Sequence, residues 1–262
     1  MGGILVAQGL IRTAELRSII TQKERYSTAV NTFRNKYNAL PGDLINASTY
    51  WGAADGVDGN QANCYTNTLT TSPLTCNGNG SGIVADTDIT LIENGVNCAT
   101  CEGLLFWQHL ANAGLIEGTY GYNGNMTPLG KISSSQWWAS QNWDTNAPSP
   151  TGYIYSASNW GNIFILQSNS PFAISRSPIA KTGVGPTAKG PFPILTPSDG
   201  YYIDSKIDDG DAIAGKISVI EGGGIANGYC ASAAFVNSSA TSASYVVSNT
   251  NVVCGLIFHQ VY

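Results

Sequence analysis

Four aspartates lie within eight residues near the C-terminal third of the sequence, at Asp204, Asp208, Asp209 and Asp211, around Gly210. Hard cations such as Ca²⁺ prefer several carboxylate and carbonyl oxygens that converge on a turn, and glycine permits such a turn. This segment therefore predicts a calcium site. The spacing does not match an EF-hand loop, and a solvated acidic loop is the alternative interpretation.

Six cysteines form a second set of reactive side chains. An even number of cysteines in a Gly- and Asn-rich chain with few charges favours disulfides formed outside the cytosol. We predict the pairing that is most local in sequence: Cys64–Cys76, Cys98–Cys101 and Cys230–Cys254. Cys98 and Cys101 are also spaced as in a thioredoxin-like redox site or part of a zinc site, but no βαβ pattern surrounds them and the sequence holds only two histidines.

Aromatic and imidazole side chains offer further chemistry. Trp137 and Trp138 lie in an aromatic-rich middle segment that could stack against a sugar, although core packing uses such rings as well. His109 and His259 are candidate bases, yet a lone histidine beside apolar residues is more often packed or capping. The sequence contains no Gly-x-Ser-x-Gly elbow, His-Glu-x-x-His pair or phosphate-binding loop. We therefore expect that the protein is not an enzyme. The remaining alternative is a secreted hydrolase whose catalytic carboxylates lie far apart in the sequence and close together in the fold.

Composition narrows the class of protein. The chain has 262 residues, of which 43% are hydrophobic and 11% charged, and its net charge is −5. Few charges and 10% aromatic residues are not typical of a disordered chain. An excess of acidic residues disfavours nucleic-acid binding, which requires Lys and Arg in excess.

The charges divide the sequence into two parts. Residues 1–36 carry six basic and two acidic side chains, a net charge of +4, whereas the rest carries −9. Apolar residues at Ile19, Tyr26, Val30 and Phe33 recur with helical spacing, and no proline occurs before Pro41. We expect residues 1–40 to form a helical spine and residues 41–262 to form a head domain.

The head is expected to combine one helix over about 101–113 with short strands. Gly114 would end this helix in the left-handed region. The β-prone runs are 153–156, 163–167, 172–174, 217–220, 233–236, 245–247 and 252–259. This pattern predicts an α+β fold in which the long N-terminal helix packs on an antiparallel sheet with long, disulfide-stapled loops.

Several blocks of sequence, together under half of the chain, resemble type IV pilins and type II secretion pseudopilins. These blocks are GGILVAQGLIR followed by AELR, YSTAVNTFRNKYNALPGD followed by ASTYWG, EGLLFWQHLANAGLIEG, and IDSKIDDG. The resemblance implies a pilin-like fold, and a C-terminal loop closed by a disulfide would be Cys230–Cys254. Some pseudopilins bind calcium near the C-terminal sheet, which would match the aspartate cluster. The processed start Phe-Thr-Leu-Ile-Glu is absent, so we expect an N-terminally truncated form.

The resemblance also implies a function. The chain would be a structural subunit, either major or minor, of a bacterial type IV pilus or type II secretion filament. Its partners would be copies of itself or other pilins, and the full-length form would be held in the inner membrane before it enters an extracellular or periplasmic filament. An adhesin or glycan-binding minor pilin that uses the aromatic head is the alternative. The residues expected to make the filament contacts are Ile4, Leu5, Leu10, Ile11, Arg12, Glu15 and Arg17.

Overall fold

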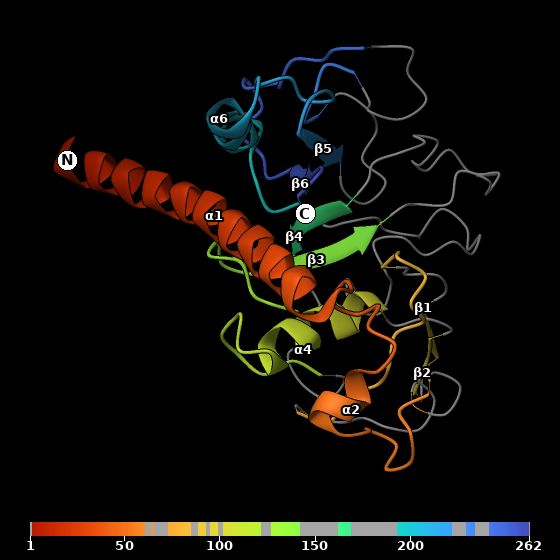
Figure 1. The fold of residues 1–262 in the computed structure, drawn as a ribbon. Coiled ribbons are helices and arrows are strands. Elements are labelled where there is room, and N and C mark those ends of the chain that lie inside the picture. Colours follow the sequence, from red (N-terminus) through yellow and green to blue (C-terminus); the bar gives the residue numbers. More distant parts are fainter. Residues whose placement is uncertain are drawn as a thin grey trace.

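The long N-terminal helix predicted from the sequence is present as α1 (Gly2–Tyr37). The computed structural model describes residues 2–60, 64, 73–84, 89–92, 95–98, 102–121, 127–141, 162–168, 193–221, 229–233 and 241–261. α1 ends at Tyr37, and the next residue, Asn38, adopts a left-handed φ of 51° and donates its N–H to the Arg34 carbonyl at 2.8 Å. The C-terminal half of α1 crosses the sheet, and its N-terminal end extends away from the rest of the molecule (Figure 1).

One stripe of α1 enters the core. Ile19, Tyr26, Val30 and Phe33 are buried, as the helical spacing predicts, and Leu16 extends the stripe by one turn. Tyr26 contacts Trp107, Trp137 and Phe164 edge-on, with ring centroids 5.0, 5.7 and 6.3 Å apart. The second half of α1 is therefore part of the same hydrophobic core as the head.

Within the described residues, four strands form an antiparallel sheet in the order β3-β4-β6-β5. The strands are β3 (Ser135–Gln141), β4 (Asn162–Ser168), β5 (Ile217–Glu221) and β6 (Cys254–Phe258). β1 (Ile89–Ile92) and β2 (Gly95–Cys98) pair separately. The α+β class is thus confirmed, as are the strands predicted at 163–167, 217–220 and 252–259.

Other parts of the strand prediction differ from the structure. β3 was not predicted, and residues 245–247 form no strand, because Tyr245 makes only an isolated bridge with Ala231. The runs at 153–156 and 172–174 and most of 233–236 lie outside the described residues.

Three further helices complete the described part of the chain. α4 (Glu102–Asn112) matches the prediction, and Gly114 with φ 72° follows it. α2 (Ala47–Trp51) and α6 (Pro197–Ile207) were not predicted. α6 begins with a capping box in which Thr196 and Asp199 exchange hydrogen bonds, and Pro197 occupies its first turn.

A tight junction joins the end of α1 to α4. We define the junction as residues 39–44, residues 74–82 and α4 from Glu102 to His109. The Gly42 N–H donates to His109 Nδ1 at 2.9 Å, so the proton of this neutral imidazole lies on Nε2. Nε2 is 3.1 Å from Thr75 Oγ1 and 3.3 Å from the Cys76 carbonyl. His109 therefore holds three chain segments together in its neutral form.

Burial makes this contact sensitive to acid. Burial lowers the pKa of His109 to about 4, below its ordinary value of 6.5. The unfolded chain therefore binds a proton that the folded protein excludes, and the free energy of unfolding falls as the pH drops from 6.5 toward 4. For His109 alone we expect a loss of about 2 kcal/mol between pH 7 and pH 5.

Urea unfolding of the wild type and of His109→Gln at both pH values measures this loss. The variant should lose clearly less stability than the wild type between pH 7 and pH 5, whatever its stability at pH 7. Burial likewise lowers the pKa of His259 to about 4, and it raises that of Asp204 to about 6, which acts in the opposite direction. Because both groups are present in wild type and variant, the comparison isolates His109. Equal losses in the two proteins would contradict the prediction.

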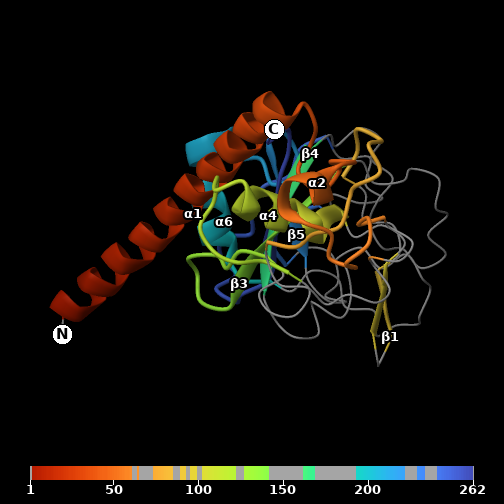
Figure 2. The same ribbon diagram turned by 60° about the horizontal axis from the view of Figure 1, so that its bottom comes forward.

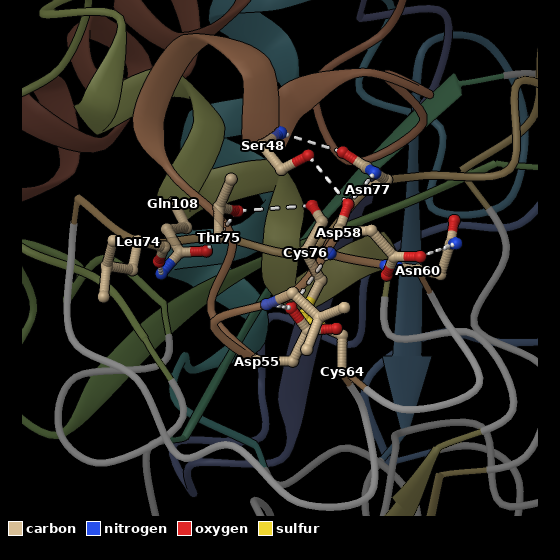
Figure 3. Close-up of a disulfide and its surroundings, with 12 residues drawn as sticks. Ser48, Asp55, Asp58, Asn60, Cys64, Leu74, Thr75, Cys76, Asn77 and Gln108 are labelled. Carbon is tan, nitrogen blue, oxygen red and sulfur yellow. Dashed lines mark hydrogen bonds between the residues drawn. A yellow bond between two sulfur atoms is a disulfide. The ribbon is translucent and has the colours of Figure 1, made fainter.

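Two of the three predicted disulfides are confirmed. Cys64–Cys76 closes a loop beside the junction (Figure 3), and Cys230–Cys254 links the segment before β6 to the first residue of that strand. Cys101 lies outside the described residues, so the predicted Cys98–Cys101 bond stays a prediction. Disulfides indicate that the protein folds in an oxidising extracellular or periplasmic setting.

Candidate assembly surface

The N-terminal end of α1 exposes apolar side chains to solvent. From residue 6 to residue 11 every side chain is exposed, and Val6, Leu10 and Ile11 have exposed fractions of 64%, 67% and 61%. Two views show this end of α1 beyond the other described elements (Figures 1 and 2). We call residues 6–11 the projecting end of α1. Large apolar side chains grouped on a projecting helix are typical of a surface that another molecule covers.

The head fixes α1 where this end begins. Arg12 forms a two-pronged contact with Asp199 of α6, from Nε to Oδ1 at 3.2 Å and from Nη2 to Oδ2 at 2.6 Å, and its Nη1 contacts Glu15 at 3.0 Å. Burial alone would raise the pKa of Asp199, but the hydrogen bonds and charge of Arg12 outweigh it and the pKa is lowered. Such paired N–H donors hold a carboxylate in one orientation, so the direction in which α1 leaves the head is set by α6.

A second contact follows five residues later. Arg17 donates from Nε to the Tyr202 hydroxyl of α6 at 3.2 Å. Asp199 and Tyr202 were not recognised from the sequence, although the Thr196-x-x-Asp199 capping box was a signal for the helix that carries them.

The residues predicted to make filament contacts therefore fall into two groups, those that are exposed and those that make contacts within the chain. Leu10 and Ile11 are exposed, as a filament contact requires, and Val6 joins them. Arg12, Glu15 and Arg17 make contacts within the chain, and their part in contacts between subunits stays a prediction. The side chains of Ile4 and Leu5 lie outside the description.

Comparison of the chain with protein-family models, curated proteins and solved structures finds no match. In the described part of the chain, no helix combines the length and the apolar character needed to cross a bilayer.

The predicted sugar platform is wrong. Trp137 and Trp138 are 0% and 2% exposed, because consecutive residues of β3 point to opposite faces of a sheet that is covered on both sides at this point. Trp137 packs against Tyr26 of α1 and Phe258 of β6. Neither ring has a face available to a ligand, so the adhesin alternative loses the residues on which it was based.

The aspartate cluster forms only in part. Carboxylate oxygens of Asp204, Asp208 and Asp209 lie within 4.8 Å of one another and could ligate a cation. Burial raises the pKa of Asp204 to about 6, although the Tyr245 hydroxyl, 2.8 Å away, donates to it. Asp211 instead accepts from the N–H groups of Ile213 and Ala243, which corrects its place in the set. Calcium binding stays a prediction.

Proposed function

We propose that this chain is a structural subunit of a bacterial filament of the type IV pilin or type II secretion pseudopilin kind, and that it assembles through its N-terminal helix. The observation that carries the proposal is the exposure of Val6, Leu10 and Ile11 on a helix that extends past the head. Three apolar side chains at 61–67% exposure are costly in water, and burial against a neighbour would recover about 1.5 kcal/mol or more for each.

The rest of the molecule supports the same function. The contact of Arg12 with Asp199 gives every copy the same helix direction, which regular assembly requires. Disulfides suit a subunit that works outside the cytosol. The sequence blocks that resemble pilins include this helix and its C-terminal turn.

The test is the presence of this chain in filaments and their dependence on Leu10. Filaments sheared from the source cell should be labelled by antibodies against the head in electron microscopy. Leu10→Glu should reduce the filament yield about a hundredfold or more, because an unpaired charge buried between subunits costs several kcal/mol. The change lies outside the core, so the head should melt at the wild-type temperature.

Val252→Glu is the matched control. Val252 is 52% exposed on the head, and the substitution introduces the same charge in place of an apolar side chain. This variant should assemble as the wild type does. Unlabelled filaments, or a Leu10→Glu variant that assembles normally, would contradict the proposed function.

A further inference from the structure

A second set of exposed apolar side chains lies around α2, at the other end of α1. Ile45, Tyr50, Val57 and Leu74 have exposed fractions of 62%, 53%, 79% and 42%. We call the exposed part of residues 45–58 together with Leu74 the α2 surface. The Tyr50 ring packs edge-on against Tyr37, the last residue of α1, with centroids 5.1 Å apart. In both ribbon views α2 lies on the opposite side of the molecule from the N-terminal end of α1 (Figures 1 and 2).

The charges of the α2 surface have one sign. Residues 39–60 and 73–84 contain no lysine and no arginine, and they contain Asp43, Asp55 and Asp58. Asp43 is buried, whereas Asp58 is exposed next to Val57. Figure 3 shows Asp55 and Asp58 on the loop that follows α2, where the Asp58 carbonyl accepts from Ser48 Oγ and Asn77 Nδ2 at 3.0 Å each. A partner for this surface should therefore be apolar and basic.

The projecting end of α1, taken together with Arg17 further along the same helix, has this character. Val6, Leu10 and Arg17 are spaced by four and seven residues, which places them on one face of the helix over about 16 Å. All three are exposed, and Arg17 uses only Nε for its contact with Tyr202 in the described structure. The face thus presents two apolar side chains and then a cation, and the α2 surface offers apolar side chains beside Asp58.

We propose that the projecting end of α1 of one copy binds the α2 surface of a second copy. The two surfaces differ and lie on opposite sides of the molecule, so the contact is heterologous and repeats without closing into a dimer. This inference rests on the proposed function, because both require the projecting end to be an assembly surface. It goes further by naming the surface that receives it.

Crosslinking between marked copies tests the contact. One preparation of the 262-residue chain carries Leu10→Cys and a second preparation carries Val57→Cys. The two are mixed with a short bis-maleimide, which reacts with free thiols and leaves disulfides intact. A covalent dimer should form in the mixture and exceed the yield of either preparation alone at least tenfold. Thr32→Cys, an exposed position on the part of α1 beside the head, replaces Leu10→Cys as the control and should give no dimer with Val57→Cys.

A charge exchange tests the orientation. Arg17→Glu or Asp58→Lys alone should lower the crosslinking yield about threefold to fivefold, which is the effect of losing one exposed ion pair. Combining Arg17→Glu on the Leu10→Cys copy with Asp58→Lys on the Val57→Cys copy should restore the yield. Failure of this exchange to restore it would overturn the pairing of these two residues.

The outcomes separate this inference from the proposed function. Labelled filaments together with Leu10–Leu10 crosslinks and no Leu10–Val57 crosslink would overturn the inference and leave the function in place. Absence of this chain from filaments would overturn the function itself. A Leu10–Val57 crosslink within labelled filaments would support both.

Discussion

Replacement of Gly78 by alanine is expected to lower the free energy of unfolding by roughly 3 kcal/mol or more. A methyl group at this position would overlap the backbone of Asp43 and the carbonyl oxygen of Gly42. Neither can move freely. Gly42 has a φ of 85° and its N–H is bonded to His109, and the Asp43 carboxylate accepts from the Ser81 and Gly82 N–H groups at 2.9 Å each. The substitution therefore forces apart the segment after α1 and the loop that surrounds Asp43.

Urea unfolding of Gly78→Ala and the wild type measures this loss. Gly9→Ala is the matched control, because a methyl group at Gly9 has no heavy atom within 4 Å and alanine favours the helix. The control should be as stable as the wild type or slightly more so. A Gly78→Ala variant within 1 kcal/mol of the wild type would show that the junction yields more easily than its packing indicates.

Loss of the Cys230–Cys254 disulfide should also destabilise the head strongly. The bond closes 24 residues with Cα atoms 5.5 Å apart, and in the chain-entropy description such a loop contributes about 3 to 4 kcal/mol. Both cysteines are fully buried, and Cys254 exchanges backbone hydrogen bonds with Leu195 at 3.0 Å. The disulfide thus anchors the segment around Cys230 to the start of β6, which is itself hydrogen-bonded to Leu195 just before α6.

The double variant Cys230→Ala/Cys254→Ala tests this expectation without introducing a buried hydroxyl. Its urea midpoint should fall by an amount that corresponds to about 3 kcal/mol. The Cys64–Cys76 disulfide closes only 12 residues. The double variant Cys64→Ala/Cys76→Ala should therefore lose less unfolding free energy than the first variant, by a few tenths of a kcal/mol to about 1 kcal/mol. A midpoint within error of the wild type for the first variant would contradict the anchoring role.

The parts of the fold that the sequence predicted correctly depend on local patterns. The buried stripe of α1 follows from the spacing of Ile19, Tyr26, Val30 and Phe33, and the end of the helix follows from Pro41. α4 likewise ends at a glycine. These signals lie within one element, so they do not depend on how the chain folds around them.

β3 was missed for a physical reason. Trp137 and Trp138 point to opposite faces of the sheet and both are buried, so the strand shows no alternation of apolar and polar residues. Its two tryptophans resembled an exposed platform because adjacent aromatic residues carry no information about which faces are covered.

Contacts between distant segments could not be predicted from spacing. Arg12 and Asp199 are 187 residues apart, and only the fold places α6 beside α1. In the sequence alone, a basic residue near an exposed helix end is equally compatible with a contact to another subunit. The same holds for the Asp204 cluster, in which three carboxylates converge while Asp211 turns toward Ala243.

The order of the strands has a consequence for biosynthesis. β6 comes last in the chain among the described strands, yet it lies between β4 and β5 in the sheet. β5 therefore has no neighbour in that sheet until residues 254–258 have left the ribosome, and a nascent chain cannot complete the head early. The Cys230–Cys254 disulfide likewise cannot form until residue 254, at the start of the last described strand, has been synthesised.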